Sequence, residues 1–177
     1  MIRPFKGISP TIADSAFIAE GAVVIGDVSI GKEASIWYNC VVRGDVNSIS
    51  IGDRSNIQDL SMLHVTHKKN AEDPGAPLVI GNDVTVGHSV TLHGCTIEDG
   101  AFIGMQAMVM DHAVVGKGAL IGARALVTEG TIIPPATLWV GSPAKYKRDL
   151  TPAEVAWLGR SAGNYVRYSR EYLEDTP

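Results

Sequence analysis

Several residue types are scarce in this chain of 177 residues. Only two cysteines are present, Cys40 and Cys95, and they form no CxxC pair. A small disulfide-stabilised secreted scaffold is therefore not expected, and a reducing compartment fits better. Aromatic residues make up only 6% of the chain, so small and β-branched side chains must build the core. Glycine is frequent, with 19 residues, but it lacks the three-residue period of collagen.

Long apolar runs and basic clusters are also missing. No run of apolar residues is long enough to span a membrane, and the N-terminal residues lack the apolar segment of a signal peptide. Lysine and arginine number 15 against 19 aspartate and glutamate residues, without a basic cluster. We therefore expect a cytoplasmic protein of one domain over residues 1–177, with neither a nucleic-acid nor a membrane partner.

Aliphatic residues recur at six-residue spacing over residues 11–140. The series begins at Ile12, Ile18 and Val24 and, after interruptions, ends at Ile133. A small or β-branched residue follows each member by four positions, except at His67. Such a hexapeptide fits a short strand plus a tight corner, and three units close one triangular coil of a β-solenoid with coils about 4.8 Å apart. A β-sandwich would instead alternate with a period of two.

Two insertions interrupt this repeat, near residues 47–50 and 68–77. Insertions in solenoids leave as loops on one face, and that face is often the binding face. The longer insertion could carry a lid or a proton shuttle, with His67, Glu72 or Asp73 as the candidate group. A solvated loop without a role is the alternative.

A different pattern follows the repeat. The tetrapeptide TPAE, which starts at residue 151, forms a capping box with proline at the first helical position. Apolar residues at helical spacing then predict an amphipathic helix over residues 151–174, packed on the solenoid or on a neighbouring subunit. The sequence therefore predicts an all-β solenoid with one C-terminal helix.

All five histidines lie between residues 64 and 112. Counting the aliphatic positions in threes assigns His64 and His93 to one face, one coil apart, with outward side chains. His88 falls on another face, so one prism cannot easily bring all three to one ion. Two prisms can, and closing that contact into a ring gives a trimer with a three-histidine metal site between subunits. Plain surface histidines are the alternative, and His112 is expected to be solvated at a corner.

Several motifs in fixed order resemble the signature of γ-class carbonic anhydrases. They are Arg43-Gly44-Asp45, Asn56-Ile57-Gln58-Asp59, His64, His88 and Leu92-His93-Gly94. The resemblance covers nearly the whole chain and implies a left-handed parallel β-helix that forms a homotrimer. It implies metal ligation by His64 and His93 of one subunit and by His88 of its neighbour.

The same resemblance implies roles for further residues. Gln58 matches the residue that hydrogen-bonds the metal-bound hydroxide, and Asn56 matches its neighbour in the motif. Tyr165 matches a tyrosine that reaches the site from the helix. The family's intersubunit ion pairs correspond to Arg43, Asp45 and Asp59.

The implied reaction is attack of metal-bound hydroxide on CO2 to give bicarbonate. Zinc suits three imidazoles best, and iron or cobalt also suits them. Two positions depart from the archaeal pattern, because Val46 and His67 stand where carboxylates are expected to export protons, so weak or cryptic activity is expected. Three alternatives stay open: an acyl-CoA thioesterase using the same site, a hexapeptide acyltransferase, and a non-catalytic metal- or siderophore-binding protein.

Overall fold

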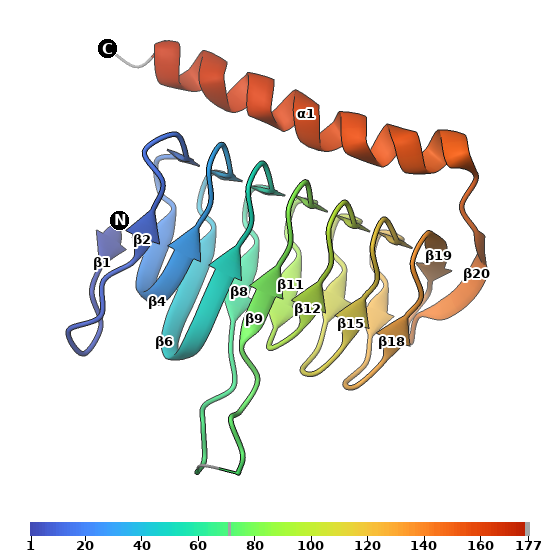
Figure 1. The fold of residues 1–177 in the computed structure, drawn as a ribbon, viewed down its shortest axis with the longest axis horizontal. Coiled ribbons are helices and arrows are strands. Elements are labelled where there is room, and N and C mark those ends of the chain that lie inside the picture. Colours follow the sequence, from blue (N-terminus) through green and yellow to red (C-terminus); the bar gives the residue numbers. More distant parts are fainter. Residues whose placement is uncertain (71, 176–177) are drawn as a thin grey trace.

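Short parallel strands stack into a triangular prism with one helix lying along it (Figure 1). The computed structural model describes residues 1–70 and 72–175. Its elements are β1 (Ile2–Arg3), β2 (Thr11–Ile12), β3 (Phe17–Ile18), β4 (Val23–Ile30), β5 (Ser35–Ile36), β6 (Val41–Ile51), β7 (Asn56–Ile57), β8 (Met62–His64), β9 (Leu78–Ile80), β10 (Thr85–Val86), β11 (Thr91–His93), β12 (Thr96–Ile97), β13 (Phe102–Ile103), β14 (Met108–Val109), β15 (Val114–Val115), β16 (Leu120–Ile121), β17 (Leu126–Val127), β18 (Ile132–Ile133), β19 (Thr137–Val140), β20 (Lys145–Asp149) and α1 (Pro152–Glu174).

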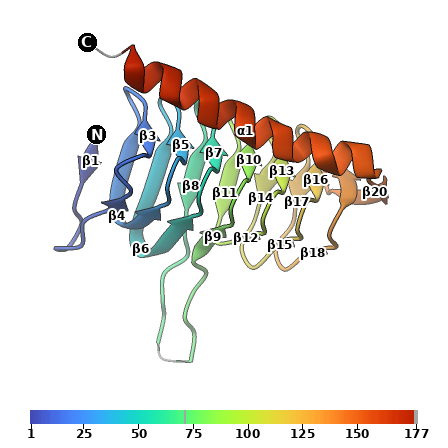
Figure 2. The same cartoon turned by 45° about the horizontal axis from the view of Figure 1, so that its top comes forward.

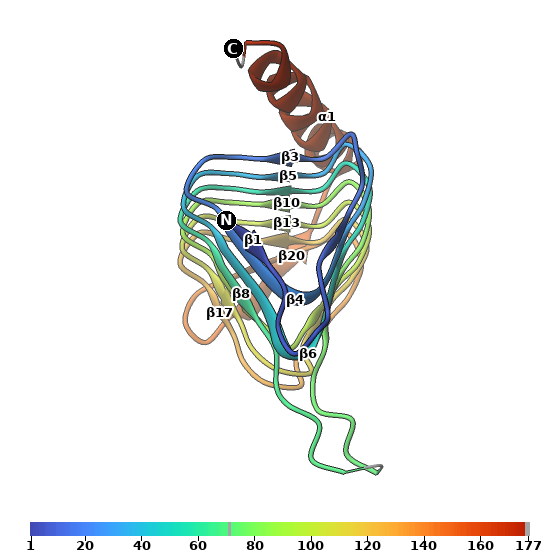
Figure 3. The same ribbon diagram turned by 90° about the vertical axis from the view of Figure 1, so that its left-hand side faces the viewer.

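The aliphatic series supplies the inward residue of each face, in the register that the sequence predicts. Figure 3 shows the three faces of the prism end-on. We call the three faces face one, face two and face three. Face one pairs Ile12, Ile30, Ile51, Ile80, Ile97, Val115 and Ile133. Face two pairs Ile18, Ile36, Ile57, Val86, Ile103, Ile121 and Trp139. Face three pairs Val24, Val42, Leu63, Leu92, Val109 and Val127. The predicted left-handed β-helix of hexapeptide repeats is confirmed.

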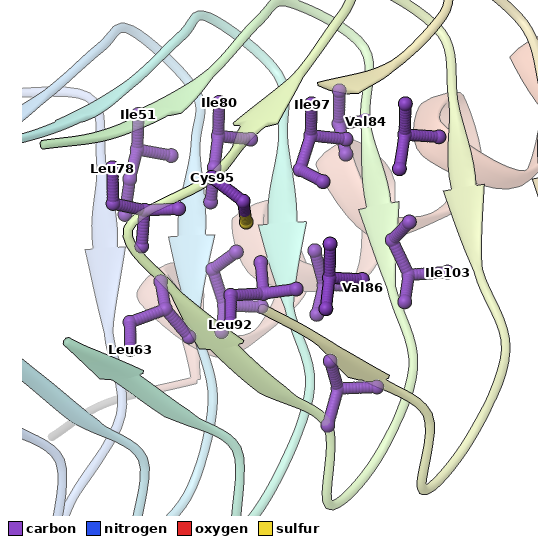
Figure 4. Close-up of a cluster of buried hydrophobic side chains, with 14 of the residues drawn as sticks. Ile51, Leu63, Leu78, Ile80, Val84, Val86, Leu92, Cys95, Ile97 and Ile103 are labelled. Carbon is purple, nitrogen blue, oxygen red and sulfur yellow. The ribbon is translucent and has the colours of Figure 1, made fainter. Parts of the chain in front are cut away.

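The core is a column of these side chains along the prism axis (Figure 4). Ile57, Leu63 and Leu92 have no exposed surface, and Ile103 is equally buried one coil further on. Burying such a side chain contributes about 1.5–3 kcal/mol to folding. The column explains why a chain with few aromatic residues can form a stable solenoid.

Side chains at one corner tie neighbouring coils together. Asp53 Oδ1 accepts a 2.8 Å hydrogen bond from the backbone N–H of Lys32, and Asn82 Oδ1 accepts one of the same length from Asp53. Asp99 Oδ1 continues this ladder by accepting from Asn82 at 2.8 Å. Short polar side chains therefore satisfy backbone donors that the corner leaves unpaired.

The helix α1 covers face two (Figure 2). It begins with the predicted capping box, in which Thr151 and Glu154 exchange side-chain to backbone hydrogen bonds. Trp37, from the coil of β5, stacks edge-on against Tyr165 of α1, with their ring centroids 5.5 Å apart. Among the described residues, no helix has the length and apolar character needed to cross a membrane.

The two insertions differ in structure. Residues 47–50 are predicted to form a loop, but β6 runs through them as a strand. The extra residues are absorbed as a register shift, because Gly26 pairs with Gly44 and Val28 then pairs with Ile49. The described part of the 68–77 insertion, residues 68–70 and 72–77, projects from the corner between face three and face one, between β8 and β9 (Figure 1).

Candidate metal centre

His64 and His93 end the paired strands β8 and β11 on face three, in direct register. Their rings face one another, with His64 Nδ1 3.1 Å from His93 Nε2. Two nitrogen ligands of a tetrahedral zinc ion lie about 3.3 Å apart, given Zn–N bonds of about 2.0–2.1 Å. The spacing of this pair therefore fits two ligands of one metal ion.

A carboxylate contacts the other nitrogen of each ring. Asp45 Oδ1 lies 3.0 Å from His64 Nε2, and Asp111 Oδ1 makes a short contact with His93 Nδ1. An ionised carboxylate can only accept hydrogen bonds, so these contacts assign the N–H groups to His64 Nε2 and His93 Nδ1. The two nitrogens that face one another then both carry lone pairs. Such a pair needs a cation between its members, either a proton or a metal ion.

The surroundings of His64 favour a neutral imidazole beside an ionised carboxylate. Burial lowers the pKa of His64 below its ordinary value, although the hydrogen bond to Asp45 opposes this effect. Burial raises the pKa of Asp45, but the hydrogen bonds from Arg43 and His64 lower it by more, so the net shift is downward. Arg43 Nη1 lies 2.6 Å from Asp45 Oδ2. A neutral histidine held by a carboxylate is the form that binds metal.

His88 follows β10 at the corner between face two and face three, in the column of Asp59. Its Nδ1 lies 2.8 Å from Asp59 Oδ2, so its Nε2 keeps the lone pair. Each of the three histidines predicted to bind metal therefore has its own carboxylate partner. Among residues 1–70 and 72–175, no three histidine, cysteine, aspartate or glutamate side chains of one chain converge as a metal site.

Gln58 and Asn56 are buried on face two, where they form a chain of hydrogen bonds next to α1. Gln58 Nε2 donates to Asn56 Oδ1 at 3.1 Å, and Asn56 Nδ2 donates to Thr85 Oγ1 at 3.0 Å. Tyr165 is half-buried and lines a pocket together with Asp59. The structure thus brings Tyr165 near the His88–Asp59 pair, while Gln58 contacts Asn56 and none of the three histidines among the described hydrogen bonds.

The remaining histidines lie outside this cluster. His67 is exposed where the 68–77 insertion begins, so it marks the start of the loop rather than a core position. His112 is exposed at a corner, as predicted. Of the two acidic shuttle candidates, Asp73 is paired with Lys69 at 3.1 Å, and Glu72 is exposed.

Asp111 is the site residue that the sequence analysis missed. Asp111 lies one coil beyond Gly94, the residue that directly follows His93. The backbone N–H of His112, next to Asp111, donates a 2.8 Å hydrogen bond to the Gly94 carbonyl. A side chain at position 94 would collide with Asp111, because a Cβ built there lies 2.6 Å from Asp111 Oδ1. An acidic residue in register with a glycine beside a ligand is the signal that could have identified it.

An apolar cavity borders His93 on face three. It has a volume of about 310 Å³, and Thr91, Met108 and Met110 contribute to its lining. Asp111 and Glu129 add two carboxylates to its lining. The cluster therefore combines two cation-binding nitrogens with an apolar wall.

Comparison with known proteins shows which family the chain is related to. The bacterial transferase hexapeptide family (six repeats) matches residues 9–44 and 94–129, and the hexapeptide repeat of succinyl-transferase matches residues 77–109. Gamma carbonic anhydrase 2 from Arabidopsis thaliana, a mitochondrial protein, is 49% identical over 94% of this chain, and the chain spans 60% of that relative. Carbonic anhydrase from Geobacillus kaustophilus is 48% identical, over 97% of this chain and 91% of the relative.

A solved structure agrees with both the fold and the sequence relationship. A hexapeptide transferase family protein from Anaplasma phagocytophilum superposes with a TM-score of 0.89 at 46% identity, over 96% of each chain. Proteins of nearly equal length with 46–48% identity belong to one family. The chain belongs to the γ-class carbonic anhydrase family of hexapeptide-repeat proteins.

Proposed function

We propose that this protein is a homotrimer that holds a divalent metal ion between subunits and hydrates CO2 to bicarbonate. The observation that carries the proposal is the His64–His93 pair, whose facing nitrogens lie 3.1 Å apart with both lone pairs available. His88 supplies the third ligand from the neighbouring subunit, since it lies on another part of the prism. Zinc is the metal that three imidazoles favour, and iron or cobalt would also fit.

An exposed apolar belt around the histidines supports the trimer. Four of the five methionines are exposed on face three or at its corner with face two, and Leu60 is exposed beside them. The belt consists of Leu60, Met62, Met105, Met108 and Met110. Leu60 is also held at a positive φ of 63°, which is unfavourable for a leucine. Exposed apolar patches of this kind mark protein interfaces, and a ring of three closes this contact.

His64, His93 and the neighbour's His88 would hold the metal, which would provide hydroxide at neutral pH by lowering the pKa of water to about 7. Asp45, Asp111 and Asp59 keep the three imidazoles in the tautomers that leave a lone pair for the metal. Gln58, fixed by its bond to Asn56, orients the attacking oxygen, and Tyr165 borders the site from α1. The apolar wall beside His93 admits CO2.

Each hydration releases one proton, since CO2 and water give bicarbonate and H⁺. Val46 offers no titratable group for its export, so we assign this role to His67, which is exposed at the start of the loop. Its ring nitrogens can accept a proton and pass it to buffer. We expect the return of the proton to solvent, rather than the attack on CO2, to limit turnover.

The test is stopped-flow CO2 hydration by protein prepared without oxygen and of known metal content, with His93→Ala as the control. We expect the rate to rise with metal occupancy and to vanish in the variant. Bound metal without hydration would contradict the proposed reaction. Acyl-thioester hydrolysis by the same preparation would then favour the thioesterase, and acyl transfer would favour the acyltransferase. Metal binding without any turnover would indicate a binding protein.

A further inference from the structure

Thr66 reaches the proposed metal ligand His93 through one carboxylate. Its hydroxyl Oγ1 donates to Asp111 Oδ2 at 2.5 Å, while the other oxygen of Asp111 contacts His93 Nδ1. Burial raises the pKa of Asp111, but the hydrogen bonds with His93 and Thr66 together outweigh it, so the net shift is downward. The hydroxyl therefore fixes one carboxylate oxygen, so that the other faces the imidazole.

Thr66 is also the first residue of the base that closes the 68–77 loop. Its backbone N–H and C=O exchange hydrogen bonds with Ala76, at 3.0 and 3.1 Å. Asn47 Nδ2 donates to the carbonyls of Thr66 and Pro74, at 3.0 and 2.9 Å. Asn47 is only 7% exposed, and it belongs to the other insertion of the repeat. The two insertions are thus joined where Thr66 contacts Asp111.

The backbone at Gly94 packs this arrangement tightly. A Cβ built at position 94 would lie 2.6 Å from Ala76 Cβ and 2.6 Å from Asp111 Oδ1. Gly94, the residue after His93, therefore packs against both the end of the loop and the carboxylate of Asp111.

We infer that Thr66 is a positioning residue for His93, and that its contact with Asp111 couples metal binding to the order of the 68–77 loop. The inference rests on the proposed metal site. Without the hydroxyl, the Asp111 carboxylate can rotate away, and His93 loses the partner that fixes its tautomer. Partners of this kind are worth about 10- to 100-fold in metal affinity.

The first experiment measures zinc affinity by competition with a chromophoric chelator. Thr66→Val removes the hydroxyl at nearly constant volume, and Thr66→Ser keeps it. Thr128→Val is the matched control, because that hydroxyl, also on face three, bonds Thr131 and no other side chain within the part of the chain that the structure describes. We expect affinity to fall about tenfold in Thr66→Val and to stay close to wild type in the other two. Thermal midpoints of the metal-free proteins separate this effect from a loss of folding.

The second experiment needs no variant and compares amide hydrogen exchange of the wild-type loop with and without zinc. We expect zinc to slow exchange in the loop and at Ala76, and to do so less in Thr66→Val. Wild-type zinc affinity in Thr66→Val, or loop exchange that zinc leaves unchanged, would overturn this inference while the metal site stands. A wild-type protein that binds no zinc would overturn both the proposed function and the inference.

Discussion

His64 and His93 stand in register on neighbouring coils, and the nitrogens that face one another are both held as acceptors by carboxylates on the far side of each ring. Two such lone pairs at 3.1 Å repel each other unless a cation lies between them. Asp45 and Asp111 thus prepare this pair for a metal ion. The following predictions test this arrangement and its surroundings.

Asp45→Ala should weaken zinc binding about 10- to 100-fold, because His64 loses the acceptor that fixes its tautomer. Zinc competition titration measures the change. Asp27→Ala is the control, since Asp27 is exposed on β4 and forms no ion pair among the described residues. Equal zinc affinities in the two variants would contradict a role of Asp45 in orienting His64.

Arg43→Ala should weaken the trimer. The Arg43 side chain is 42% exposed and bonds Asp45 through one nitrogen, so its other donors can reach a neighbouring subunit. An exposed ion pair is worth about 0.2–1 kcal/mol, so loss at three interfaces should raise the dissociation constant roughly 3- to 150-fold. Sedimentation on dilution measures this. Arg54→Ala removes a bidentate pair with Asp83 and serves as control; the same dissociation in both variants would contradict the interface role of Arg43.

Cys40 and Cys95 should resist thiol reagents in the folded protein at pH 8. Burial raises the pKa of the Cys40 thiol to about 11 and that of Cys95 to about 12, so almost no reactive thiolate is present. A chromogenic disulfide reagent should label neither residue in the native protein and both in concentrated guanidinium chloride. Rapid native labelling would show that the core opens.

Glu154 should make the attachment of α1 sensitive to acid. The Arg148 guanidinium, followed by the donors of Thr151, lowers the pKa of Glu154 from 4.5 to about 2. Because the pKa of Glu154 is lower in the folded than in the unfolded protein, its ionised form stabilises the folded state above pH 4.5. That stabilisation is lost as the pH falls toward 2. Helical circular dichroism in thermal melts between pH 7 and 2 measures it. Glu154→Gln should flatten this dependence, whereas Glu171→Gln, beside the exposed Arg167, should leave it intact.

The register could be predicted because every sixth residue must face inward on a prism of small, uniform coils. Ile57 on face two and Leu63 on face three are fully buried where the spacing puts them. The same count predicts that His64 and His93 are neighbours although 29 residues separate them. A period in the sequence is thus sufficient to place two site residues.

The positions of the two insertions could be read from the period, but the contacts that their residues make could not be predicted. Thr66 and Asp111 lie 45 residues apart, and their contact depends on the path of the loop and on the gap at Gly94. Strand β6 continues through residues 47–50 with a register shift against β4, and Asn47 in this stretch donates its amide to a loop carbonyl. Both features involve hydrogen bonds outside the repeat, and no periodicity reports them.

The most direct test of the central claim combines two inactive variants in one trimer. His88→Ala and His93→Ala subunits, carrying different tags, are expressed together, and bound zinc is measured in purified mixed trimers. Each variant alone should bind no zinc, whereas every mixed trimer should regain about one third of its sites, because intact ligands then meet across one of its three interfaces. CO2 hydration should return in the same proportion. Mixed trimers without zinc, or full zinc occupancy in His88→Ala alone, would contradict a metal site shared between subunits.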